Sequence, residues 1–402
     1  MQTRLAAQYR NTALGEEADK VLRSCVHCGF CNATCPTYQL LGDELDGPRG
    51  RIYQIKQLLE GGEASINVQR HLDRCLTCRA CETTCPSGVE YNKLLDIGRG
   101  LVEQRLPRPF LQRLYRKLII FSFSESSRVR WLLFSARLFT PLLPASVKKR
   151  IPAIVDTPAA SPRPQARTML LLDGCVQPAA APHINKLTIQ VFDRLGIQLR
   201  TVAESGCCGA LQHHLSDNEG ARQRARTNID AWWPLIERGA EAIVVTASGC
   251  TPMVKDYQHL LQGDDQYAER AKRISAMTQD LSEILSREDL SELRPQHKKR
   301  IAFHSPCSLQ HAQKLDGVVE SLLKQAGFTL VPVRDAHLCC GSAGTYSILQ
   351  AALSAQLRTN KLDCLQEKHP ELIATANIGC LLHLQAKADL PVIHWIELLA
   401  SC

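Results

Sequence analysis

The sequence lacks the features that mark several large classes of protein. Aromatic residues make up only 5% of its 402 residues, and it contains no nucleic-acid-binding motif, so we expect no nucleic-acid partner. Its longest apolar runs, such as residues 118–124, are far shorter than a membrane-spanning helix, and the N-terminal residues do not form a secretory signal. A glycine-rich dinucleotide fingerprint and a Ser-His-Asp arrangement are also absent. We therefore expect a cytoplasmic protein without a flavin or nicotinamide site of its own.

Acidic residues are nearly missing from one segment. Residues 105–150 carry eleven Lys or Arg and one acid, Glu125. Residues 110–121 and 128–139 place aromatic and aliphatic side chains at helical spacing, opposite basic ones. Two interpretations stay open: helices that lie on an anionic membrane surface, or helices packed on the cysteine-rich domain or on another subunit. The Pro-rich residues 157–167 are predicted to be a linker.

Cysteine, by contrast, is abundant, with eighteen residues. A cytoplasmic protein keeps its thiols reduced, so clustered cysteines there indicate metal binding. Residues 25–36 and 75–86 both have the spacing Cys-x2-Cys-x2-Cys-x3-Cys-Pro. In two-cluster ferredoxins the fourth cysteine of such a run binds the other cluster, whereas zinc sites prefer two separate Cys-x2-Cys pairs. We predict two [4Fe–4S] clusters with these ligands: Cys25, Cys28, Cys31 and Cys85 for the first, and Cys75, Cys78, Cys81 and Cys35 for the second.

Three arginines close to these cysteines are candidates for tuning the clusters. Arg49, Arg51 and Arg79 lie near the two runs in the sequence. Cations beside a thiolate-bound cluster change its reduction potential. The alternative, that all three are solvated surface residues, stays open.

The C-terminal region contains an internal repeat. From residue 168 onward, short apolar segments alternate with helical ones, and cysteines recur in register. The repeated cysteines are Cys175, Cys207, Cys208 and Cys250 in the first copy, and Cys307, Cys339, Cys340 and Cys380 in the second. The first three pairs are offset by 132 residues and the last by 130. We predict a duplicated α/β unit with cysteines at the C-terminal ends of its strands, where open α/β sheets bind ligands.

These patterns predict an α+β protein. A mostly helical, two-cluster ferredoxin-like domain is followed by a duplicated α/β Cys-Cys-Gly domain. The expected boundaries are residues 1–104 for the cluster domain, 105–167 for a basic amphipathic connector, and 168–290 and 291–402 for the two repeats.

The two cysteine runs, together with NIDAWWP (228–234), HLCCGSAGTY (337–346) and TANIGC (375–380), resemble a known family. This is the Cys-Cys-Gly family of heterodisulfide reductase type, and the resemblance is closest to the iron–sulfur subunits of bacterial glycolate oxidases. It implies an electron-relay subunit without catalytic residues. Electrons would come from FAD on partner subunits that oxidise glycolate, with D-lactate as a second substrate. They would leave to a quinone at the cytoplasmic face of the inner membrane.

The sequence departs from the heterodisulfide reductase pattern in both repeats. Ala247 and Asn377 replace the leading cysteine of a Cys-x2-Cys pair, so a five-cysteine cluster lacks one ligand in each repeat. Either four sulfurs hold a further cluster, or these cysteines are small apolar residues. Two other functions stay open: a disulfide or quinone reductase of heterodisulfide reductase or glycerol-3-phosphate dehydrogenase type, centred on the Cys-Cys-Gly cysteines, and an iron or redox sensor.

Overall fold

The computed structural model describes residues 1–142, 151–153, 155, 157, 164–291, 293 and 299–401. Within it the chain forms two compact units. Unit 1 consists of Met1–Arg116 and His337–Lys361, and unit 2 of Lys117–Ala336 and Leu362–Cys402. Most of the predicted linker, residues 157–167, lies outside the described residues.

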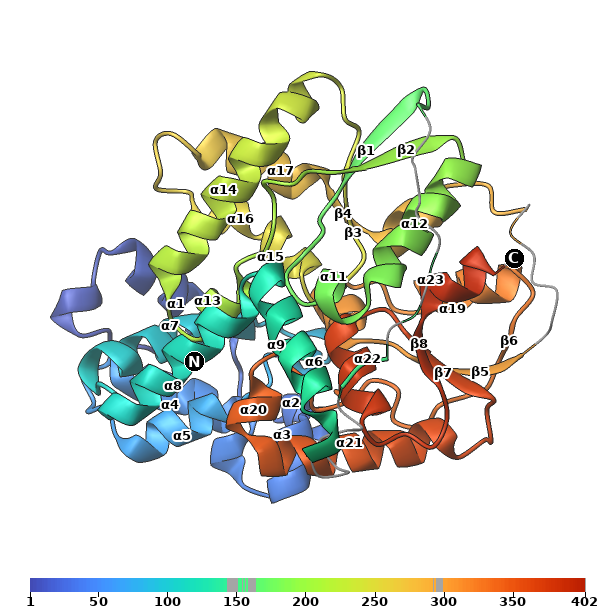
Figure 1. The fold of residues 1–402 in the computed structure, drawn as a ribbon. Coiled ribbons are helices and arrows are strands. Elements are labelled where there is room, and N and C mark those ends of the chain that lie inside the picture. The colour runs from blue at the N-terminus through green and yellow to red at the C-terminus, as the bar shows by residue number, and fades with distance from the viewer. Residues whose placement is uncertain are drawn as a thin grey trace. The chain divides into compact units, whose positions relative to one another are not determined.

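Unit 1 is built from short helices that alternate with cysteine loops (Figure 1). Its N-terminal segment contains η1 (Ala7–Tyr9), α1 (Ala13–Ser24), α2 (Phe30–Ala33), α3 (Pro36–Leu41), η2 (Glu44–Asp46), α4 (Pro48–Leu59), α5 (Ile66–Asp73), α6 (Ala80–Thr83) and α7 (Tyr91–Arg105). Prolines open α3 and α4, as suits a first helical position that needs no N–H. The predicted mostly helical character of this region is confirmed.

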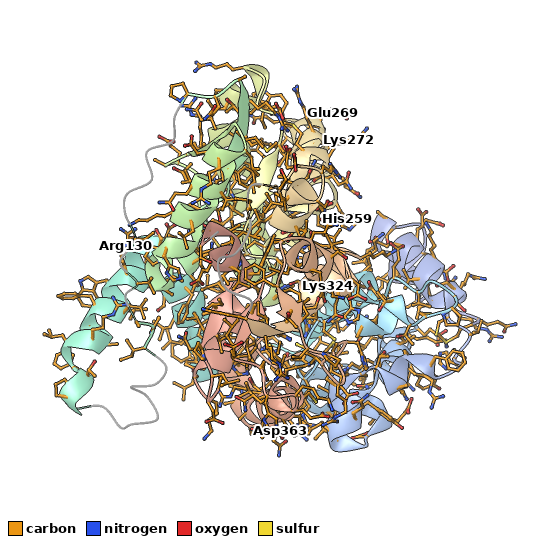
Figure 2. The ribbon with its side chains drawn as sticks, turned by 90° about the vertical axis from the view of Figure 1, so that its right-hand side faces the viewer. Arg130, His259, Glu269, Lys272, Lys324 and Asp363 are labelled. Carbon is orange, nitrogen blue, oxygen red and sulfur yellow. The ribbon has the colours of Figure 1, made fainter. Side chains whose placement is uncertain are left out.

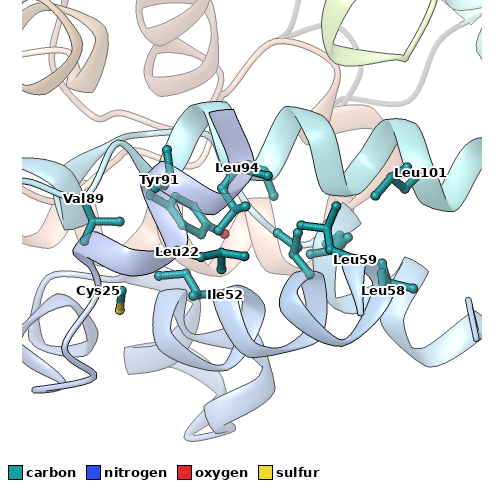
Figure 3. Packing of buried hydrophobic residues seen from close by; sticks show 14 of the residues in the cluster. Leu22, Cys25, Ile52, Leu58, Leu59, Val89, Tyr91, Leu94 and Leu101 are labelled. Atoms are coloured by element: carbon teal, nitrogen blue, oxygen red, sulfur yellow. The ribbon is translucent and has the colours of Figure 1, made fainter. Parts of the chain in front are cut away.

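The core of unit 1 holds the cysteine loops in place. Leu22 of α1, Ile55 of α4 and Leu94 of α7 are fully buried in one apolar cluster, which reaches as far as Cys25 (Figure 3). Helix α7 approaches α4 closely at Gly98, where a Cβ atom would lie 2.5 Å from Ile55 Cγ1. The cysteine loops therefore extend from a tightly packed helical base.

Unit 2 contains most of the duplicated α/β region, and residues 337–361 of the second repeat belong to unit 1. Helix α8 (Phe110–Phe123) leads into it and is followed by α9 (Ser126–Leu138) and η3 (Thr140–Leu142). The first repeat has β1 (Arg167–Leu171), α11 (Gln177–Ala180), α12 (Pro182–Arg194), β2 (Ile197–Thr201), α13 (Ala210–His214), α14 (Asn218–Glu237), β3 (Ile243–Val245), α15 (Thr251–Lys255), α16 (Tyr257–Leu260), α17 (Ala268–Met277), β4 (Thr278–Asp280) and α18 (Leu281–Leu285). The second has β5 (Arg300–His304), η4 (Ser308–Ala312), α19 (Val318–Gln325), β6 (Thr329–Leu330), α20 (Tyr346–Leu349), α21 (Ala351–Gln366), β7 (Leu372–Thr375), α22 (Ile378–Gln385), β8 (Val392–His394) and α23 (Trp395–Ala400).

The two repeats have the same sheet topology. Each forms a four-stranded parallel sheet, in the orders β2-β1-β3-β4 and β6-β5-β7-β8. Strands β3 and β7 are buried along their whole length, as is typical of parallel strands with both faces covered. The predicted duplication and the predicted fold class are thereby confirmed.

Cysteines follow the carboxyl ends of the strands. In the first repeat, Cys175 comes after β1 and Cys250 after β3, the two central strands between which the strand order reverses. In the second repeat, Cys307 and Cys380 come after β5 and β7 in the same way. Open α/β sheets bind their ligands at such reversal points, so the topology positions these sulfurs for a ligand.

Candidate metal centres

A hollow in the surface of unit 1 is lined by Cys25, Cys28, Cys31, Cys85 and also Cys81. We call Cys25, Cys28, Cys31 and Cys85 the first thiol set, because the charges of the other three members act on the pKa of Cys31. In the free thiol form, burial and the negative charges of the other three members raise the pKa of Cys31 to about 11. Burial raises the pKa of Cys25 as well, and the charge of Cys85 adds to this effect. The fold therefore places one cysteine of the second run beside three of the first.

The remaining four cysteines of the two runs form the second thiol set, which consists of Cys35, Cys75, Cys78 and Cys81. All four are buried. Burial raises the pKa of Cys81 far above its usual value, and the charges of its three partners and of Glu82 act in the same direction. The charges that act on Cys31 and on Cys81 are consistent with three cysteines of one run and the fourth of the other in each set. This grouping, and the binding of iron by each sulfur, stay predictions.

The loops of the two sets share an unusual backbone conformation. His27 and Thr77 occupy equivalent positions and have φ values of 57° and 55°. The next equivalent pair, Gly29 and Arg79, have φ values of 88° and 61°. Left-handed conformations are unfavourable for residues other than glycine and are found mainly where the surroundings impose them. A rigid ligand bound by each loop gives a physical reason for this repeated strain.

Two groups of four thiols suit two cubane clusters. Each iron of a [4Fe–4S] cluster takes one Cys thiolate, so four converging sulfurs satisfy one cluster. The raised pKa values of Cys31 and Cys81 mean that the free thiols stay protonated at neutral pH. Metal binding would release these protons and replace the repulsion between thiolates by bonds to iron. When bound, such clusters accept and donate single electrons.

The first Cys-Cys-Gly repeat also brings its sulfurs together. We call them the repeat-one thiols, which consist of Cys175, Cys207, Cys208 and Cys250, all in unit 2. Cys207 exchanges side-chain hydrogen bonds with Cys175 and Cys208, and Cys208 with Cys250. The hydrogen bonds from Cys175 and Cys208 hold the pKa of Cys207 well below its usual value, whereas the same bonds raise the pKa values of their donors. One thiolate shared among four sulfurs is the form that this arrangement favours.

Two buried residues that were not among the predicted site residues hold the Cys-Cys turn. Asn228 Nδ2 donates to Cys207 O at 3.0 Å, and its Oδ1 accepts from Gly206 N at 2.9 Å. The Tyr257 hydroxyl donates to Cys208 O at 2.9 Å. Asn228 opens the NIDAWWP segment, so the resemblance contained a signal for it, whereas Tyr257 has none. These bonds fix the backbone of the turn, not its sulfurs.

The second repeat distributes its cysteines differently. Cys339 and Cys340 belong to unit 1, whereas Cys307 and Cys380 belong to unit 2. Asn377, at the position of the missing cysteine, donates from Nδ2 to Cys380 Sγ at 3.5 Å. An amide therefore occupies the place of a fifth sulfur in this repeat.

Tyr346 connects the Cys-Cys-Gly turn of the second repeat with the second thiol set inside unit 1. Burial raises the pKa of Tyr346 well above its usual value. The charge of Cys75 adds to this effect, and that of Cys339 does so more weakly. The tyrosine thus lies within electrostatic reach of a predicted cluster ligand and of the repeat.

Helices α8 and α9 expose many apolar side chains. Trp131 is 71% exposed and Phe121 is 58% exposed. The Arg128 guanidinium carbon lies 3.8 Å from the centroid of the Phe121 ring. Arg130, two residues further along α9, is also part of this segment (Figure 2). Basic and aromatic groups thus share this surface. Among the described residues, no helix combines the length and the apolar character needed to cross a membrane.

Comparisons with known proteins identify both parts of the chain. A family model described as a 4Fe-4S dicluster domain matches residues 21–89. A second model, described as a cysteine-rich domain, matches twice, over residues 169–255 and 301–385. The two matches of the second model correspond to the two repeats.

Similar proteins extend over the whole chain. The chain is 52% identical to the glycolate oxidase iron-sulfur subunit of Escherichia coli (strain K12), covering 99% of this chain and 98% of that protein. It is 29% identical to the probable glycolate oxidase iron-sulfur subunit of Bacillus subtilis (strain 168), covering 90% and 88%. A crystal structure of a hypothetical protein from Helicobacter pylori superposes with a TM-score of 0.53 at 12% identity, covering 98% of this chain and 72% of that one. At this identity the likeness concerns the fold alone.

Proposed function

Because this chain belongs to the family of glycolate oxidase iron–sulfur subunits, we propose that it relays electrons within a complex that oxidises glycolate. The electrons come from FAD on partner subunits, where glycolate is oxidised to glyoxylate and D-lactate is a second substrate. No residue of this chain acts on the substrate. The observation that carries the proposal is the convergence of eight thiols into two sets in unit 1.

The thiol sets suit the electron balance of this reaction. Oxidation of glycolate to glyoxylate releases two electrons and two protons, which a flavin can accept together. Two clusters held by the two sets would each take one electron, so the chain can divide the pair into single-electron transfers. The described part of the chain then needs only to hold the clusters and to keep water from the buried second set.

The test is anaerobic purification of the native complex. We expect co-purification with a flavoprotein, about eight irons per chain, and glycolate-dependent reduction of a one-electron dye. A preparation that contains this iron but reduces the dye with neither glycolate nor D-lactate would refute the substrate and leave the relay intact. A colourless, iron-free or zinc-only protein would refute the relay itself.

The proposed electron acceptor is a quinone in the inner membrane, with the chain bound to the cytoplasmic face through α9 and the adjoining end of α8. Trp131, Phe134 and Leu138 are more than half exposed there. Arg128, Arg130 and the other basic residues of this segment give the same surface a positive charge. Aromatic and basic groups together favour the interface of an anionic bilayer.

Vesicle flotation tests the membrane proposal. The native complex should float with phosphatidylglycerol vesicles and not with phosphatidylcholine vesicles. The double variant Trp131→Ser, Phe134→Ser should lose flotation, whereas Tyr53→Ser, which removes a 48% exposed aromatic residue of unit 1, should keep it. If the double variant floats normally but no longer retains the flavoprotein, α9 is a subunit interface and the membrane proposal fails.

A second candidate function is reduction of a disulfide or a quinone at the repeat-one thiols. It is favoured by the mutual hydrogen bonds of the four sulfurs and by the thiolate that they stabilise at Cys207. In such a reaction two of the thiols become a disulfide, and two electrons and two protons pass to the substrate. Disulfide reduction by the wild-type chain that is lost in Cys207→Ser would establish it. Unchanged dye reduction in the same variant would restrict the repeat to a structural role in the relay.

A further inference from the structure

The second thiol set lies beside a buried ionic network that the first set lacks. Arg51 and Asp46 are both completely buried, with 3.3 Å between Arg51 Nη2 and Asp46 Oδ1. Arg74 Nη1 lies 2.7 Å from Asp46 Oδ2, and His71 Nδ1 lies 3.0 Å from Asp46 Oδ1. The Arg51 Nε–H also donates to His71 O at 2.8 Å. Two guanidinium groups face one carboxylate, so the network carries a net positive charge.

This network reaches a sulfur of the second set through one hydroxyl. Both terminal nitrogens of Arg51 donate to Thr37 Oγ1 at 3.2 Å. The same hydroxyl donates to Asp46 O at 2.8 Å, and its oxygen lies 3.3 Å from Cys35 Sγ. Burial opposes the charge of Arg51, yet the charges of Cys75 and of Cys35 help to raise its pKa above the usual value. Arg51 therefore stays a cation, and its nearest anions include two predicted ligands of the second cluster.

Other charges around the second set do not cancel this cation. Arg99 donates to Cys75 O at 2.8 Å and to Thr77 Oγ1 at 3.0 Å. Glu82 is the opposing acid, but burial raises its pKa, and the neighbouring Arg79 lies 3.9 Å away. The sum of these groups is positive.

The cations of the first set are more exposed or already paired. Arg49 is 36% exposed and lies 2.6 Å from the carboxylate of Glu44. The Met1 ammonium donates to Cys25 O at 2.9 Å from a partly exposed position. Water and salt screen such charges, whereas they screen a buried charge much less.

We propose that Arg51 makes the cluster on the second thiol set the acceptor within the pair, so that electrons pass from the first set to the second; this rests on the proposed function. Reduction adds one negative charge to a cluster, and a buried cation stabilises that added charge. Burial alone acts in the opposite direction, because it disfavours the more negative state. The proposal is that the charge of Arg51, which the Thr37 hydroxyl holds near Cys35, outweighs burial.

This order agrees with the accessibility of the two sets. Cys28 of the first set is exposed, and so are Val26 and Phe30 of the same loop. The second set is buried in unit 1 and lies within electrostatic reach of Tyr346. Electrons therefore enter at the open set, where a flavoprotein can dock, and pass from there to the closed one.

The test is a redox titration of the anaerobically purified chain, followed by electron paramagnetic resonance. Dithionite and dyes set the potential, so the result does not depend on glycolate or on any partner. In Arg51→Gln the higher of the two midpoint potentials should fall, and the equilibrium constant for electron exchange should drop about tenfold, which corresponds to about 59 mV for one electron. Arg49→Gln, the control, should leave the higher potential in place.

Arg51→Gln removes one ion-pair partner of the buried Asp46, so this variant can misfold. Thr37→Val is a second test that keeps this ion pair. Valine has nearly the shape of threonine, and the variant keeps Arg51 while removing the hydroxyl beside Cys35. The higher potential should fall again, by less than in Arg51→Gln. The proposal is overturned if either variant, with its full iron content, lowers only the lower potential or changes neither.

Discussion

The exchange of the fourth cysteine between the two runs makes a sharp prediction about iron content. Cys85 belongs to the second run, yet it lies in the first thiol set, where its charge raises the pKa values of Cys25 and Cys31. Cys35 belongs to the first run, yet its charge acts on Cys81 of the second set. Replacing Cys85 by serine should therefore damage the first cluster and spare the second.

The expected loss follows from the ligand count. Each set supplies four sulfurs to four irons, so the intact chain binds about eight irons. Cys85→Ser leaves three sulfurs in the first set, and about one to four irons should be lost, depending on whether a three-iron cluster persists. All four sulfurs of the second set remain, so its signal and its potential should be unchanged. Cys35→Ser should give the converse result.

The identity of the surviving cluster can be determined by adding Thr37→Val. Thr37 lies next to Cys35 Sγ, so its removal changes only the second cluster. In a redox titration, the potential of the cluster that survives Cys85→Ser should still fall when Thr37→Val is added. If Thr37→Val lowers a potential in the chain with both clusters but not in Cys85→Ser, Cys85 is a ligand of the second cluster and the grouping is wrong.

Two changes away from the clusters test the packing. Gly98→Ala should destabilise unit 1 by about 1–3 kcal/mol, because the new Cβ would clash with Ile55. Gly100→Ala, whose Cβ meets no atom within 4 Å, should instead stabilise it by up to about 1 kcal/mol. Urea unfolding of the anaerobic protein measures both changes. Burial lowers the pKa of His394 to about 4 from 6.5, so the folded state binds fewer protons than the unfolded chain and stability falls as the pH drops below 6.5. From pH 7.5 to 5 the wild type should lose about 2 kcal/mol more than His394→Asn.

The duplicated fold and the cysteine groups were predictable because they depend on spacing along the chain. Cysteines at intervals of three residues can only face a common centre, and the register of Cys207 with Cys339 reveals the duplication. The surroundings of the sulfurs were not predictable. Arg51 was one of three candidate cations, and nothing in the spacing shows that it is buried while Arg49 is partly exposed. That difference arises from the packing of α4 against η2 and α5, which brings Asp46 and His71 to the guanidinium.

The two repeats also show that the surroundings of equivalent cysteines cannot be predicted from their spacing. A Cβ on Gly209 would meet Ala221 O and Arg224 Cβ, and a Cβ on Gly341 would meet Ser354 O and Leu357 Cβ. The helix after the turn is therefore shifted by one residue relative to the cysteines, and Lys361 corresponds to Asn228. Both side chains are buried, but one carries an amide and the other an amine. The cysteines of the two copies therefore have different surroundings, and a property established for one repeat does not transfer to the other.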